Sequence, residues 1–190
     1  MKNPLVHETA IVEEGFVLGD RTRVWHFSHL MDGSRIGSDC IIGQNVFIDK
    51  NVTIGNGVKI QNNVSIYNGV TIEDDVFIGP SVVFTNVINP RSFIDRKNEF
   101  QPTLVKRGAT IGANATIICG VEIGSYAMIG AGSVVTKAVK SFELVYGNPA
   151  VLRGWVSKNG YRLIFNEKGE SVCKSTGEKY RLKDEEVTIL

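Results

Sequence analysis

Three histidines, His7, His26 and His29, are the side chains best suited to metal binding or to proton transfer near neutral pH. A zinc site of the γ-carbonic anhydrase type needs three imidazole rings that converge on one ion. His26 and His29 follow Val24 by two and five residues, so in a regular repeat their side chains project in different directions. We therefore expect no metal, and such a zinc enzyme stays open as an alternative.

The three cysteines, Cys40, Cys119 and Cys173, are widely separated and odd in number, which favours free packing thiols and a cytoplasmic setting. Lys and Arg number 21 against 20 Asp and Glu. This balance gives no reason to expect nucleic acid or a membrane surface as a partner. The sequence also has neither a secretory signal pattern nor an apolar stretch of membrane-spanning length, so we expect neither.

A large apolar residue recurs at every sixth position over most of the chain, which is the strongest pattern in the sequence. The first run consists of Val6, Val12, Leu18, Val24, Leu30, Ile36, Ile42, Ile48, Ile54, Ile60, Ile66, Ile72, Ile78 and Phe84. The second run consists of Val105, Ile111, Ile117, Ile123, Ile129 and Val135. A period of six fits neither an α-helix nor a flat strand.

Short strands joined by corners explain this period, with the large residue pointing inward and small or β-branched residues packed inside the corners. Three such faces make an 18-residue coil, and twenty repeats give six to seven coils of an all-β parallel β-helix. The repeated Ile and Val residues are then core. We place this β-helix at residues 1–153.

Residues 86–106 interrupt the repeat, because the 21 residues from Phe84 to Val105 are not a multiple of six. A long excursion from a regular solenoid is more often functional than not. After Pro149 the repeat ends, and residues 154–190 alternate in a way that predicts one or two β-hairpins capping the open end.

The second run, with Gly108-Ala-Thr-Ile-Gly-Ala, Ile129-Gly-Ala-Gly-Ser and Tyr146-Gly-Asn-Pro-Ala, resembles the coenzyme A-binding coils of hexapeptide-repeat acetyltransferases. The resemblance implies a left-handed β-helix and acetyl-CoA as co-substrate. Small residues let a pantetheine arm lie against the backbone, and cations can meet its phosphates. The candidate cofactor-binding residues are Gly108, Ala113, Ala131, Lys137 and Arg153. For Lys137, a solvated surface charge is an equal alternative.

Over nearly its whole length the chain is similar to the UDP-2-acetamido-3-amino-2,3-dideoxy-glucuronate N-acetyltransferases of bacterial O-antigen and lipopolysaccharide biosynthesis. The excursion, His26-Phe-Ser-His29 and the tail from Gly154-Trp155 to Tyr180 carry this likeness. It implies transfer of an acetyl group to the sugar 3-amino group in a homotrimer with active sites between subunits. Trp25 and Phe27, on outward-facing positions, also suggest a covered wall. A non-catalytic scaffold solenoid remains an alternative.

Many related O-acetyltransferases place a catalytic histidine just before the excursion, where this chain has Asn86. An amide cannot act as a base, but an amine nucleophile with a pKa near 8 is partly neutral at pH 7 and needs none. We therefore predict direct attack by the amine of a UDP-linked sugar uronate, with Asn86 orienting it. The candidate cations for the carboxylate and diphosphate are Arg35, Arg91, Lys97 and Lys106.

Overall fold

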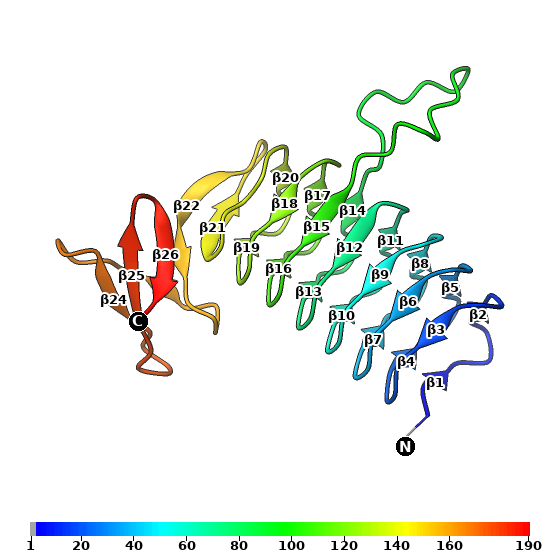
Figure 1. Cartoon of the computed structure of the whole chain (residues 1–190), viewed down its shortest axis with the longest axis horizontal. Helices are drawn as coiled ribbons and strands as arrows, with labels where there is room; N and C mark the ends of the chain where they lie inside the picture. Colours follow the sequence, from blue (N-terminus) through cyan, green and yellow to red (C-terminus); the bar gives the residue numbers. More distant parts are fainter. Residues whose placement is uncertain (1–2) are drawn as a thin grey trace.

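The computed structural model describes residues 3–190, and within that range it contains β-strands and no helix. Most strands are two residues long, because each six-residue repeat forms one short strand and one corner. Three parallel sheets form the walls of a prism, which is the predicted parallel β-helix (Figure 1). These residues include no helix long and apolar enough to cross a membrane.

The first sheet continues beyond the prism into the C-terminal region. In spatial order it contains β1 (Leu5–Val6), β4 (Arg23–Val24), β7 (Ile41–Ile42), β10 (Lys59–Ile60), β13 (Phe77–Ile78), β16 (Thr110–Ile111), β19 (Met128–Ile129), β21 (Glu143–Tyr146), β22 (Val151–Val156) and β23 (Arg162–Leu163). The strands from β1 to β21 are parallel, whereas β22 and β23 are antiparallel additions.

The second and third sheets are wholly parallel. The second contains β2 (Ile11–Val12), β5 (His29–Leu30), β8 (Phe47–Ile48), β11 (Ser65–Ile66), β14 (Val83–Phe84), β17 (Thr116–Ile117) and β20 (Val134–Val135). The third contains β3 (Val17–Leu18), β6 (Arg35–Ile36), β9 (Thr53–Ile54), β12 (Val70–Ile72), β15 (Thr103–Val105) and β18 (Glu122–Ile123). We call the turns after strands of the first, second and third sheets corners 1, 2 and 3.

The register of the sheets is 18 residues, as the sequence predicts. Ile42 pairs with Val24 on one side and with Ile60 on the other, and all three are fully buried. Eight parallel strands, from β1 to β21, stack in the first sheet, so the solenoid makes about eight turns. The six-residue period gave six to seven coils because β21 pairs Met128 with Leu144, only 16 residues later.

The excursion leaves the prism at corner 2 and projects into solvent (Figure 1). The backbone N–H of Gln101 donates to the carbonyl oxygen of Asn86 at 2.9 Å and closes its neck. The chain is back in the third sheet by Thr103, which pairs with Val70. The segment outside the prism is therefore 86–102, a little shorter than the 86–106 expected from the repeat.

The C-terminal region forms a separate small lobe at the end of the prism (Figure 1). A three-stranded antiparallel sheet contains β24 (Glu170–Val172), β25 (Lys179–Lys183) and β26 (Glu186–Ile189). Its core includes Phe142, Leu163, Cys173, Tyr180 and Val187. The strand β22 runs across residue 153, so the lobe is continuous with the last coil. All three cysteines are free and buried, as expected.

Candidate functional site

Asn86 lies at the base of the excursion, immediately after β14 and Thr85. Its backbone is fixed by the bond from Gln101, and the Thr85 hydroxyl oxygen accepts a hydrogen bond of 2.9 Å from the Cys119 N–H of the next coil. Within residues 3–190 no hydrogen-bond partner meets the half-buried side-chain amide of Asn86. A rigid backbone therefore presents a free carboxamide, which can accept from and donate to a ligand.

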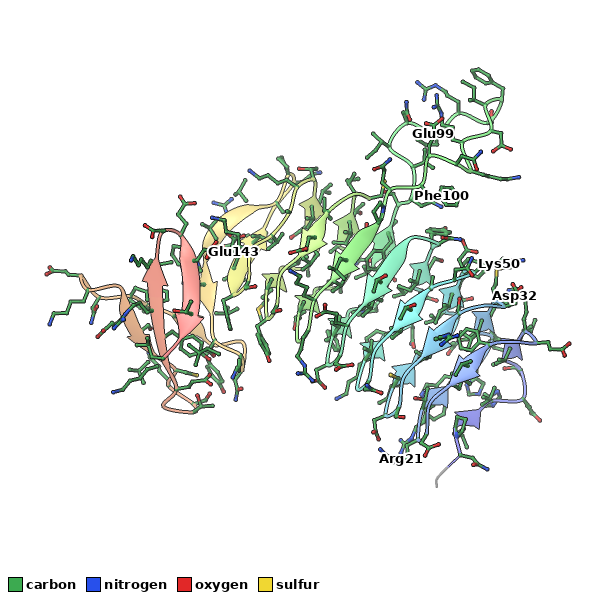
Figure 2. The ribbon with its side chains drawn as sticks, viewed as in Figure 1. Arg21, Asp32, Lys50, Glu99, Phe100 and Glu143 are labelled. Carbon is green, nitrogen blue, oxygen red and sulfur yellow. The ribbon has the colours of Figure 1, made fainter. Side chains whose placement is uncertain are left out.

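Corner 2 is one continuous edge of the prism. Figure 2 shows Asp32 and Lys50 on the edge from which the excursion rises with Glu99 and Phe100. The 18-residue register places Lys50 two coils before Asn86 in the same column of this edge, and Lys50 is paired with Asp32 at 3.2 Å.

Corner 1 changes character near the middle of the solenoid. In an early coil the Gln44 N–H donates to Asn62 Oδ1 of the next coil at 2.9 Å. The same column continues with Pro80, Ala113 and Ala131, none of which carries a side-chain acceptor. Among residues 3–190 no acceptor is bonded to the N–H groups of Ala113 and Ala131, so both are available to a ligand.

Glycines allow the coils to approach closely at this corner. A Cβ on Gly79 would lie 2.6 Å from the Ala113 nitrogen, and one on Gly112 would lie 2.5 Å from the Ala131 nitrogen. The two uncapped N–H groups therefore sit one coil apart, at a strand spacing of about 4.8 Å, on a smooth edge of small residues. Backbone amides in such a row can bind the amide and carbonyl groups of an extended ligand.

Gly108 lies on corner 3, away from the other predicted cofactor-binding residues. Its φ of 68° is in the left-handed region, and a Cβ there would meet the Tyr126 ring at 2.5 Å. The Gly108 N–H already donates to the Asp74 carbonyl oxygen at 3.0 Å. The sequence suggested Gly108 or Ala113 as the donor to a developing oxyanion, and this bond leaves Ala113.

Lys137 and Arg153 lie near the C-terminal end of the prism but on different edges. Lys137 is exposed on corner 2, in the same column as Asn86 and two coils further on. Arg153 on β22 lies over the Tyr146 ring, 5.1 Å from its centroid. Tyr146 in turn covers Gly130, where a Cβ would lie 2.7 Å from the Tyr146 Cβ. Arg153 thus continues the edge that contains Ala131.

One chain does not gather the four predicted substrate cations. Arg35 is exposed on β6, three strands from β15 in the third sheet, a distance of about 14 Å. Arg91 and Lys97 both lie on the exposed excursion, and Lys97 is 3.7 Å from Asp95. Lys106 is paired with Glu122 at 2.7 Å, and this carboxylate raises the pKa of Lys106.

The histidines do not converge on a common point. His7 and His26 stack with ring centroids 3.5 Å apart, whereas His29 Nε2 lies 2.8 Å from Glu13 Oε1. Bonds from the Asp32 N–H and then from His29 hold the pKa of Glu13 below its usual range. Residues 3–190 contain no group of three His, Cys, Asp or Glu side chains able to hold a metal ion.

The sequence matches a family described as bacterial transferase hexapeptide (six repeats) over residues 2–50, 51–86 and 102–137. The chain belongs to this family. The gap between the second and third matched ranges coincides with the excursion, and the match stops before the C-terminal lobe.

Known relatives of this hexapeptide family member share its length and fold. It is 45% identical over 179 residues to the dTDP-3-amino-3,6-dideoxy-alpha-D-galactopyranose 3-N-acetyltransferase of Aneurinibacillus thermoaerophilus, covering 94% of this chain and 91% of the relative. It resembles a galactoside acetyltransferase in complex with coenzyme A, with 25% identity and a TM-score of 0.58 over 73% and 74% of the two chains. The acetyltransferase domain of PglB from Neisseria gonorrhoeae FA1090, 17% identical with a TM-score of 0.56 over 80% and 58%, shares the fold.

Sequence reasoning missed two features of the site. Gln101 closes the excursion, and Tyr146 links the Ala131 edge to Arg153. The 18-residue register would have placed Ala113 and Ala131 in one column, but the bond from Gln101 depends on the path of a loop outside the repeat.

Proposed function

We propose that the protein is an acetyl-CoA-dependent N-acetyltransferase that acts on the 3-amino group of a nucleotide-linked sugar. The single observation that carries this proposal is the free carboxamide of Asn86 at the neck of the excursion, where a base is absent. The 45% identical relative is named a 3-N-acetyltransferase of a dTDP-amino sugar, which supports the same chemistry. The uncapped N–H groups of Ala113 and Ala131 fit a pantetheine arm.

The reaction needs two copies of the chain. Asn86 lies on corner 2 and Ala113 on corner 1, at opposite edges of the second sheet. A six-residue face spans up to about 20 Å, whereas reacting atoms must approach to about 3–3.5 Å. We propose a homotrimer in which corner 1 of one subunit faces corner 2 of the next. The exposed Trp25 and Phe27 are further surface that a neighbouring subunit would cover.

In this arrangement Asn86 Oδ1 accepts a hydrogen bond from the sugar amine and directs its lone pair at the thioester carbon. The Ala113 N–H of the neighbouring subunit donates to the carbonyl oxygen as it becomes negative. The C–N bond forms, the C–S bond breaks, and the ammonium proton passes to the departing thiolate. Its thiol pKa of about 8.5 makes that sulfur a sufficient final acceptor.

The finer proposal is that the acceptor is a UDP-linked 2-acetamido-3-amino-2,3-dideoxy-glucuronate, as the likeness of the excursion and tail suggests. The dTDP sugar named for the relative is a 3,6-dideoxy sugar and has no carboxylate at C6. Both candidates carry the 3-amino group. Arg91 and Lys97, on the excursion, are the cations placed near Asn86 in sequence that a uronate could use.

The deciding experiment measures thiol release from acetyl-CoA with a panel of four acceptors: the UDP 3-amino uronate, its neutral 6-hydroxy analogue, the dTDP 3-amino-3,6-dideoxy sugar and a 4-amino isomer. We expect turnover with the 3-amino sugars and the highest kcat/KM with the uronate. Preference for the dTDP sugar would replace the finer proposal and keep the 3-N-acetyltransferase. No thiol release with any amino sugar would reject both.

A further inference from the structure

A groove on the C-terminal lobe has no assigned role in the reaction. It has a volume of about 620 Å³ and is lined by residues of β22, β23 and the segment after them. Two guanidinium groups, those of Arg153 and Arg162, stand at the groove together with the aromatic rings of Trp155 and Phe165. No acidic side chain lines it, so the groove is cationic and partly aromatic.

The polar groups of the groove are free to bind a ligand. Arg153 and Arg162 are exposed, and no carboxylate within residues 3–190 forms an ion pair with either. Arg162 Nη2 donates to the Arg153 carbonyl oxygen at 3.0 Å, which holds its guanidinium beside the groove. The Trp155 indole nitrogen is buried and finds no acceptor in the part of the chain that the structure describes.

The groove lies at the end of the edge that contains Ala113 and Ala131. Tyr146 stacks on Gly130 of that edge, Arg153 covers Tyr146, and Arg162 bonds to Arg153. From β16 to β23 the order is β16, β19, β21, β22 and β23. Four strand spacings of about 4.8 Å give a path of about 19 Å.

This length matches the reach of coenzyme A. Its chain from the thioester sulfur to the ribose has about 17 bonds, which span about 20 Å when extended at roughly 1.2 Å per bond. With the thioester at Ala113, the adenosine arrives at the groove. There Trp155 and Phe165, whose rings meet edge to face at 5.8 Å, provide the aromatic surface, and the two arginines meet the phosphates.

We propose that this groove binds the 3′-phosphoadenosine end of acetyl-CoA, with Arg162 on the phosphates and the base against Trp155 and Phe165. This inference rests on the proposed function for its ligand. It gives the C-terminal lobe a part in holding the co-substrate, in addition to closing the prism.

Binding of a fragment tests the proposal without requiring any transfer reaction. The chain has two tryptophans, so a Trp25→Phe protein reports on Trp155 alone. We expect adenosine 3′,5′-bisphosphate to change its fluorescence saturably, and UDP to leave the signal unchanged. No saturable change with the bisphosphate, or an equal response to UDP, would overturn the proposal.

Two charge insertions on the same lobe provide a matched comparison. Ile164 is 75% exposed at the groove and Val172 is 56% exposed outside it, so a glutamate at either position should leave the core intact. Ile164→Glu should weaken binding of the bisphosphate at least tenfold by repulsion, whereas Val172→Glu should not. Equal affinity in both variants would contradict the assignment of the groove.

Kinetics separate the nucleotide end from the rest of the co-substrate. Arg162→Gln should raise the KM for acetyl-CoA about tenfold or more, because a charge-assisted bond is lost. Its KM for S-acetyl-4′-phosphopantetheine, which lacks the adenosine 3′-phosphate, should equal that of the wild type. Lys174→Gln, at an exposed position outside the groove, is the control. Equal losses with both thioesters would reject a contact to the nucleotide end, even if acetyl transfer itself is established.

Discussion

The backbone N–H of Gln101 donates to the carbonyl oxygen of Asn86 at 2.9 Å, so the excursion begins and ends at two residues that are directly bonded. The coils on either side pair without it, since β14 continues into β17 and β12 into β15. The loop is therefore an insertion into a complete wall, held at a closed neck.

Removing the loop should leave the solenoid folded. Replacement of residues 89–99 by a short Gly-Ser link keeps both ends of the neck and shortens a closed loop, which costs little entropy. We expect a circular dichroism spectrum and melting temperature close to those of the wild type, with turnover reduced at least a hundredfold. A folded variant of full activity would show that the excursion takes no part in the reaction.

Ala113→Pro tests the oxyanion donor with little risk to the fold. Pro80 occupies the same position of corner 1 one coil earlier, so the backbone there already accepts a proline. Loss of the N–H should lower kcat by about 10² to 10³, as for other single oxyanion donors. Ala131→Pro, one coil further on, should chiefly raise the KM for acetyl-CoA. If the two variants behave alike in kcat, the oxyanion is stabilised elsewhere.

The walls of the prism could be predicted from the sequence because each core position is repeated many times. Ile42, for example, has equivalents 18 residues away on both sides, and each votes for the same register. The repeat fails where the backbone changes pitch, as at Met128 and Leu144, and it cannot describe the lobe, whose contacts between Phe142 and Tyr180 join distant segments.

The site was predictable only in part. Asn86 is visible in the sequence because it stands where the period breaks. The state of a backbone N–H is not visible in the same way. The Gly108 N–H is used by Asp74, while that of Ala113 is free, and the difference depends on what the adjacent coil places opposite each one.

Complementation between two inactive chains tests whether the site lies between subunits. Asn86→Ala and Ala113→Pro damage opposite edges of one chain. In trimers mixed from equal amounts, about a quarter of intersubunit sites combine two intact edges, so about a quarter of the wild-type activity should return. Light scattering should give about three times 20.8 kDa. A monomer, or mixed trimers without activity, would reject the shared site.

Arg91→Ala tests the carboxylate of the proposed acceptor. Arg91 is exposed on the excursion, and its Nη1 donates only to the neighbouring Pro90 carbonyl oxygen at 2.9 Å within residues 3–190. If it binds the uronate, kcat/KM for that sugar should fall at least tenfold, and kcat/KM for the neutral 3-amino analogue should change little. Arg96→Ala, which removes an ion pair with Glu99 in the same loop, is the control for loop structure. Equal losses on both sugars would assign Arg91 to the diphosphate or to the loop fold.

Asn86→Ala should reduce turnover by one to two powers of ten without abolishing it, because the carboxamide orients the amine and takes no proton. The pH profile carries the sharper test. With no enzymic base, the rate should rise with the free-amine fraction and level off above the amine pKa of about 8, in the wild type and the variant alike. The alternative is a histidine from a neighbouring subunit. His29 already lies 2.8 Å from Glu13, whereas His26 stacks on His7 and has no carboxylate partner within residues 3–190. An acidic limb that is present in the wild type and lost in His26→Gln or His29→Gln would identify that base and remove the reason for an unassisted amine.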